Sequence, residues 1–92
     1  PTQYFETGTA KNSVVSNGCL IEGSLEHSVV GRGCIIKKGA VIKNCVVLSD
    51  AYIGENVHLE NQVIDKHAKI THVKELTATE DRPGYVRRND TI

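Results

Sequence analysis

The 92-residue sequence has no methionine, no excess of either charge and no long apolar run. Because 11 basic residues balance 11 acidic ones, nothing indicates the positive surface of a nucleic-acid or anionic-membrane binder. No apolar run approaches the roughly 20 residues of a membrane-spanning helix. Since PTQYFETG contains neither an initiator methionine nor a signal-peptide pattern, we expect a piece of a longer protein. At this length we expect one small domain without a large enclosed active site.

Aliphatic residues recur about every sixth position and form what we call rungs. They are Val15, Ile21, Leu25, Val30, Ile36, Ile42, Val47, Ile53, Leu59, Ile64 and Ile70. A second pattern has the same period: KNSVV, EHSVV, KNCVV and ENQVI begin at Lys11, Glu26, Lys43 and Glu60, separated by 15, 17 and 17 residues. Such an internal repeat is typical of a solenoid, in which each unit buries its apolar side against its neighbours.

Small residues occupy most positions two before a rung, where the two-residue period of a strand predicts a second inward side chain. Nine of the eleven are Gly, Ala, Ser or Cys: Ser13, Cys19, Gly23, Ser28, Cys34, Ala40, Cys45, Ala51 and Ala68; the other two are Val57 and Gln62. A narrow interior with three short strands per turn predicts a triangular prism. Its corners are expected at Asn17-Gly18, Arg32-Gly33, Lys38-Gly39 and Glu55-Asn56, and in the column Asn12, His27, Asn44 and Asn61, because Gly and Asn tolerate positive φ.

This pattern resembles the left-handed parallel β-helix of the hexapeptide-repeat proteins, an all-β, single-stranded fold. The spacing predicts the coil, whereas the left hand is implied by the resemblance. We expect about three and a half coils over residues 13–70, a lead-in from a missing catalytic domain over 1–12, and a capping, extended tail over 71–92.

The stretch from Asn12 to Ile70 is similar nearly throughout to the C-terminal domain of bacterial glucose-1-phosphate adenylyltransferase, or ADP-glucose pyrophosphorylase. NGCLIEG at Asn17–Gly23 and VIDKHAKI at Val63–Ile70 resemble its regulatory-type, GlgD-like subunit of glycogen biosynthesis. The resemblance implies a cytoplasmic parent protein that makes ADP-glucose and pyrophosphate from ATP, with Mg²⁺, and glucose 1-phosphate. That chemistry belongs to an N-terminal domain, so this fragment carries no catalytic residues. The implied partners are that domain and the other subunits of a homo- or hetero-tetramer, with no nucleic acid and no membrane.

Three other functions compete with this interpretation. His67 and His72 have the H-x4-H spacing of the γ-class carbonic anhydrases, which share the fold, but no third histidine lies near Gly33, two coils earlier. We therefore predict no metal site. A hexapeptide acyltransferase is disfavoured because no inserted loop interrupts the side that carries Leu25, Ile42 and Leu59. The third alternative is a β-helix module of another sugar nucleotidyltransferase.

The three cysteines, Cys19, Cys34 and Cys45, all fall at small inward positions, and none has CxxC spacing. A disulfide between Cys19 and Cys34 is geometrically conceivable on consecutive coils. The odd count and a cytoplasmic location favour reduced, buried thiols.

Two surface sites are predicted. Arg87 and Arg88 are candidate ligands for a phosphorylated effector, because the resemblance implies control by such metabolites and arginine clamps phosphate well. Ile35, Val41 and Tyr52 are predicted to lie outward on the side that carries Ile36 and Ile53. They are candidate subunit contacts because that side is more apolar than a solvated wall requires.

Overall fold

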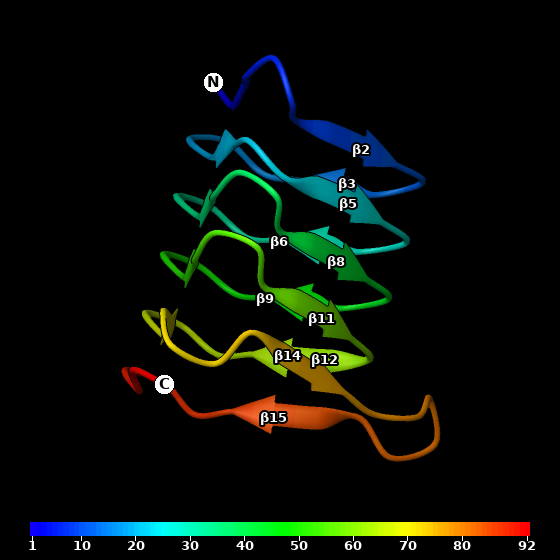
Figure 1. Ribbon diagram of the computed structural model, residues 1–92. Coiled ribbons are helices and arrows are strands. Elements are labelled where there is room, and N and C mark those ends of the chain that lie inside the picture. The colour runs from blue at the N-terminus through cyan, green and yellow to red at the C-terminus, as the bar shows by residue number, and fades with distance from the viewer.

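The computed structural model describes residues 1–92 and consists of strands and turns, with no helix and hence none that could cross a membrane. Fifteen strands of two or three residues form three parallel five-stranded sheets. The chain winds from one end to the other as a single left-handed coil (Figure 1). The all-β, parallel β-helix predicted from the repeat is confirmed.

Successive strands alternate among three sheets, which form the sides of the prism (Figure 1). Sheet A contains β1 (Gln3–Tyr4), β4 (Leu20–Ile21), β7 (Ile35–Ile36), β10 (Tyr52–Ile53) and β13 (Lys69–Ile70). Sheet B contains β2 (Thr9–Lys11), β5 (Ser24–Glu26), β8 (Val41–Lys43), β11 (His58–Glu60) and β14 (Glu75–Thr77). Sheet C contains β3 (Val14–Val15), β6 (Val29–Val30), β9 (Val46–Val47), β12 (Gln62–Ile64) and β15 (Gly84–Val86).

The core is the stack of rungs inside the prism. Strand register places Ile36 between Ile21 and Ile53, and all three side chains are fully buried. Every rung from Ile21 to Ile70 is buried, and so are the small residues two positions before them. Each short strand therefore contributes one large and one small inward side chain, as the sequence predicts.

The corners use left-handed backbone wherever the chain must turn sharply between sheets. Positive φ occurs at the predicted corner residues Gly18, Gly33, Gly39 and Asn56, and along the predicted column Asn12, His27, Asn44 and Asn61. The other positive-φ residues are Asp50, His67 and Asn89. Asn, Asp and His are the non-glycine residues that adopt this conformation most readily. The repeat of these residue types therefore fixes the prism's edges.

Polar side chains satisfy backbone groups inside the corner between sheets B and C. The hydroxyl of Ser28 donates to the carbonyl oxygen of Glu26 at 2.9 Å and accepts the backbone N–H of Cys45 at 3.1 Å. One coil earlier, Ser13 makes the same pair of bonds, to the carbonyl of Lys11 and from the N–H of Ser28. Buried backbone groups need such partners, which explains serine at an inward position.

Ser28→Ala is expected to destabilise the domain by roughly 1–3 kcal/mol, because the N–H of Cys45 would remain buried without a partner. For a domain of this size, each 1 kcal/mol lowers Tm by about 4–8 °C. Thermal unfolding followed by circular dichroism measures the effect. Ser13→Ala is the matched control, since Ser13 is half-exposed and solvent can replace its bonds. Equal melting temperatures for Ser28→Ala and the wild type would contradict this role.

The coil extends beyond the predicted span 13–70 at the C-terminal end. Leu76 aligns with Leu59, Val86 aligns with Ile64, and the carbonyl of Ile92 accepts the N–H of Thr71 at 2.8 Å. The tail is thus a further coil rather than only an extended cap. Its pattern escapes a search for rungs because the residue two before Leu76 is Lys74, which is neither small nor buried, and a long loop separates β14 from β15 (Figure 1).

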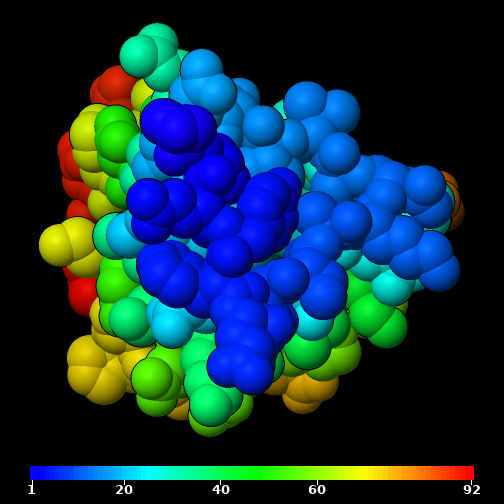
Figure 2. Space-filling model, turned by 90° about the horizontal axis from the view of Figure 1, so that it is seen from above, coloured from blue at the N-terminus to red at the C-terminus, as the bar shows by residue number.

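The coil also extends into the predicted lead-in at the N-terminal end. Strands β1 and β2 pair in register with β4 and β5, which places Tyr4 beside Ile21 and Ala10 beside Leu25. Figure 2 shows these N-terminal residues spread across the end of the prism. Tyr4 and Phe5 remain exposed there. Residues 1–12 therefore form most of the first coil.

Candidate functional site

Sheet B presents an alternating ladder of charges to solvent. Strand register aligns Lys11, Glu26, Lys43 and Glu60, one from each of four consecutive strands. Neighbouring strands lie roughly 4.8 Å apart, so each charge faces the opposite charge on the next strand. This side of the prism is suited to remain in water.

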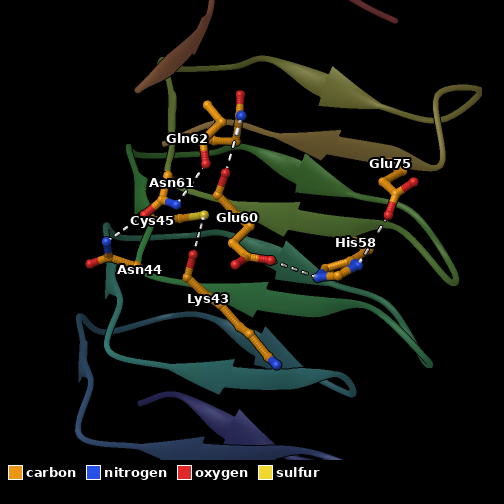
Figure 3. A network of polar contacts seen from close by, with 9 residues as sticks. Lys43, Asn44, Cys45, His58, Glu60, Asn61, Gln62 and Glu75 are labelled. Carbon is orange, nitrogen blue, oxygen red and sulfur yellow. Dashed lines mark hydrogen bonds and ion pairs between the residues drawn. The ribbon is translucent and has the colours of Figure 1, made fainter. Parts of the chain in front are cut away.

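His58 lies in the second outward column of sheet B, between two carboxylates (Figure 3). Its Nε2 is 3.5 Å from Oε2 of Glu60, and its Nδ1 is 3.6 Å from Oε2 of Glu75. At the other end of these strands, at the corner between sheets B and C, the Asn44 side-chain amide donates to Oδ1 of Asn61 at 2.5 Å (Figure 3). The His58–Glu75 and Asn44–Asn61 contacts join neighbouring coils, whereas His58 and Glu60 lie on the same strand. No group of three or more His, Cys, Asp or Glu side chains forms a cluster that could hold a metal ion.

His67 and His72 each have a neighbour of their own. His67, at the corner between sheets C and A, has Nε2 3.9 Å from Oδ2 of Asp50. Nδ1 of His72 is 2.9 Å from the hydroxyl of Thr71. The two histidines thus share no common partner.

The three thiols are free and buried inside the prism. Each Sγ donates to a backbone carbonyl oxygen at 3.1 Å. Burial raises the pKa of Cys34 to about 11 and also raises the pKa of Cys45. A thiol that remains protonated is a poor nucleophile. All three cysteines are buried in the core, where they act as small side chains.

Arg87 and Arg88 follow β15 and are both exposed. Nε of Arg87 donates to Oδ2 of Asp90 at 3.2 Å. The hydroxyl of Tyr85 donates to Asp65, which lowers the pKa of that carboxyl, and the nearby charge of Arg88 lowers it less. Both candidate effector ligands therefore lie beside acidic groups, and binding of an effector stays a prediction.

The basic residues earlier in the chain do not form one cluster. Arg32 lines a polar hollow of about 450 Å³ at the corner between sheets C and A. Nζ of Lys37 is 3.3 Å from Oε1 of Glu22 at the corner between sheets A and B. Lys43 belongs to the charge ladder of sheet B. No shared anion site follows from their arrangement.

Two of the three predicted subunit-contact residues lie together. Ile35 and Tyr52 are adjacent outward residues of sheet A, and Leu20 extends the same column. The prediction that Val41 lies on this side is wrong, because Val41 belongs to β8 of sheet B, beside His58. The corner at Gly39 separates it from sheet A.

Sequence reasoning missed the most apolar outward column, which runs along sheet C. Strand register aligns its members, one from every strand of the sheet: Val14, Val29, Val46, Val63 and Tyr85. The four valines are the first aliphatic residues of the four repeated pentapeptides. The sequence therefore already contained this column. It was interpreted only as evidence for the repeat, because the outward valine of each pentapeptide was not distinguished from the inward residue that follows it.

The family comparison matches nearly the whole chain. A family described as "GlmU-like, C-terminal hexapeptide" matches residues 2–91. The match includes the first and last coils as well as the regular repeats between them.

Curated relatives are similar over most of this chain. Glucose-1-phosphate adenylyltransferase of Acetivibrio thermocellus is 38% identical over 88 residues, 95% of this chain and 21% of the relative. That of Fervidobacterium nodosum is 39% identical over 70 residues, 76% of this chain and 17% of the relative. Glycogen biosynthesis protein GlgD of Bacillus subtilis is 38% identical over 88 residues, 96% of this chain and 26% of the relative. The chain thus spans only about a sixth to a quarter of these relatives' lengths.

Proposed function

Because the chain belongs to the GlmU-like, C-terminal hexapeptide family, we propose that it is the C-terminal β-helix of a glucose-1-phosphate adenylyltransferase subunit in glycogen biosynthesis. The observation that carries the proposal is the 38% identity over 88 residues to relatives of both names, adenylyltransferase and GlgD. That similarity extends beyond the regular repeats, so it supports more than a shared fold.

The proposed role of this domain is assembly of the parent protein. In the parent, ATP with Mg²⁺ and glucose 1-phosphate react in a separate N-terminal domain, and this β-helix packs against that domain and against other subunits of a tetramer. Apolar outward columns on sheets A and C support such packing. A cytoplasmic location agrees with three unpaired, buried thiols.

A regulatory role is the finer part of the proposal. Arg87 and Arg88 supply two adjacent guanidinium groups at the exposed C-terminal turn, and these can hold a phosphorylated metabolite by charge-assisted hydrogen bonds. Asp90 competes for Arg87, so an effector must displace that contact.

The nature of the parent protein can be tested from the chain that precedes Pro1. We expect it to contain a glycine-rich, basic phosphate loop near its start. The purified parent, alone or with a catalytic partner subunit, should convert ATP and glucose 1-phosphate into ADP-glucose and pyrophosphate. An upstream domain without such a loop would contradict the proposal.

The double variant Ile35→Glu/Tyr52→Glu is expected to reduce the assembly state of the parent protein, because it places two charges in the apolar centre of sheet A. Size-exclusion chromatography with light scattering measures the assembly state. The matched control is Ser24→Glu/Val41→Glu, an adjacent outward pair in register on sheet B. If the sheet A variant assembles like the wild type, the contact lies elsewhere.

A further inference from the structure

His58 lies between two carboxylates that belong to different coils (Figure 3). Glu60 is on the same strand as His58, β11, whereas Glu75 is on β14 of the last coil. Because Oε2 of Glu60 lies 3.5 Å from Nε2 and Oε2 of Glu75 lies 3.6 Å from Nδ1, each ring nitrogen faces one acidic oxygen. Neither carboxylate has a second ion-pair partner.

A neutral imidazole cannot satisfy this arrangement. It has one N–H donor and one acceptor nitrogen, whereas a carboxylate can only accept. One nitrogen lone pair of a neutral His58 therefore points at a carboxylate oxygen. Water does not relieve the conflict at Nε2, which is shielded from solvent and has no hydrogen-bond partner. Only the protonated ring, with an N–H on both nitrogens, is complementary to both carboxylates.

No other charged side chain around His58 changes its charge near neutral pH. The residue in register with it on β8 is Val41, which is uncharged, and Lys43 lies in the neighbouring column. Lys74, just before β14, donates from Nζ to the carbonyl oxygen of Glu55 at 3.0 Å. Lysine and glutamate ordinarily keep their charges between about pH 5.5 and 8, whereas histidine titrates in this range. A change of pH within the range therefore acts on the imidazole.

The contact between His58 and Glu75 fastens a strand that has only one neighbour. Strand β14 is the last strand of sheet B and pairs with β11 alone. One backbone hydrogen bond reports on this pairing from beyond the end of β14, because the N–H of Ala78 donates to the carbonyl oxygen of Glu60 at 3.1 Å. Chain ends open at a lower free energy than inner strands do, so even a contact of modest strength affects how often β14 opens.

We propose that His58, Glu60 and Glu75 form a pH-sensitive latch that fastens the last coil to the rest of the prism. Below neutral pH the charged ring attracts Glu60 on its own strand and Glu75 on β14, which holds β14 against β11. Above neutral pH the ring loses a proton, one of the two contacts becomes repulsive, and β14 opens more often. Since the closed coil binds more protons than the open coil, closure weakens as the pH rises.

The latch goes beyond the proposed function, because it acts within the 92-residue chain and needs neither the parent domain nor an effector. Its failure would leave the assignment to a glucose-1-phosphate adenylyltransferase subunit untouched. The last coil also carries Arg87 and Arg88, which directly follow β15. The pH therefore sets how firmly the coil that presents these two side chains is held.

Hydrogen exchange followed by NMR on the 92-residue chain tests the latch. The protection of the Ala78 N–H, corrected for the pH dependence of chemical exchange, measures how often β14 opens. It should be about two- to five-fold higher at about pH 5.5 than at about pH 8, the size expected for an exposed charge pair. The N–H of Val29, which donates to the carbonyl oxygen of Cys45 at 3.0 Å between inner coils, should show no such difference. Equal corrected protection of Ala78 at the two pH values would overturn the proposal.

Three substitutions assign the pH dependence to the latch. His58→Gln keeps a polar side chain but cannot change its charge, and Glu75→Gln removes the charge on β14, so each should abolish the pH difference at Ala78. His67→Gln is the matched control, because His67 is also exposed and has Nε2 3.9 Å from a carboxylate oxygen of Asp50, but at the corner between sheets C and A. It should retain the full difference. A difference that survives in either latch variant, or that disappears in His67→Gln, would overturn the proposal.

Discussion

We expect Ile36→Asp to unfold the domain, because Ile36 is fully buried between Ile21 and Ile53 in the middle of the prism. An unpaired carboxylate at such a site costs several kcal/mol, and the lost aliphatic packing adds roughly 2–5 kcal/mol. Small domains have a free energy of unfolding of only about 5–15 kcal/mol. The variant should lose its cooperative thermal transition in circular dichroism.

The neighbouring residue is the control. Ile35→Asp introduces the same carboxylate one position earlier on β7, where the side chain points outward. It should retain the strand spectrum and a cooperative melt. A native spectrum and an unchanged Tm for Ile36→Asp would show that Ile36 does not point inward.

Gly23→Ala is expected to have the second-largest effect. The chain passes from Ile21 to Leu25 in four residues, so this corner is cut short and Gly23 stacks directly on Ala40. A Cβ at Gly23 would lie 2.6 Å from the carbonyl oxygen of Ala40 and 2.9 Å from that of Lys37. Both atoms belong to the backbone, which cannot move away from the new Cβ as a flexible side chain could. Overpacking of this kind costs about 1–3 kcal/mol, and we expect the upper end.

The melting temperature of Gly23→Ala should therefore fall by roughly 12–24 °C, at about 4–8 °C for each kcal/mol. Gly18→Asn is the control, because Gly18 has a φ of 79° and the nearest atom to an added Cβ is 3.8 Å away. Asn89 adopts positive φ at the corresponding corner of the last coil. Gly18→Asn should be nearly neutral. Equal melting temperatures for the two variants would refute the steric argument.

The regular coils were predictable from the sequence because their signals are local and repeated. Residues like the rung Ile42, its small partner Ala40 and the corner residue Gly39 recur with the same period. The first two types fill the core, and the third turns the chain. The two terminal coils were less predictable. In the last coil the expected small inward residue is replaced by Lys74, which is exposed and donates to the carbonyl oxygen of Glu55 at 3.0 Å. The loop after β14 also breaks the spacing to Val86.

The candidate subunit-contact residues were also predicted only in part. Ile35 and Tyr52 were found because both directly precede a rung. Val41 was assigned to the wrong side because a side of the prism is set by the corner at Gly39, not by distance along the chain. The resemblance to glucose-1-phosphate adenylyltransferase was confirmed by the comparisons, whereas the effector site at Arg87 and Arg88 stays a prediction.

By itself, the sequence determined the parallel coil, its triangular section, its buried rungs and its family. The reason is that inward residues and corner residues recur at regular intervals along the chain. Only the tertiary structure decided which outward residues become neighbours. Val14 and Tyr85 are 71 positions apart (85 − 14), yet they belong to one column because stacked strands bring every coil into register. The repeated pentapeptides already carry the four valines of this column, but only the stacked strands add Tyr85 and make the five residues one apolar side of sheet C.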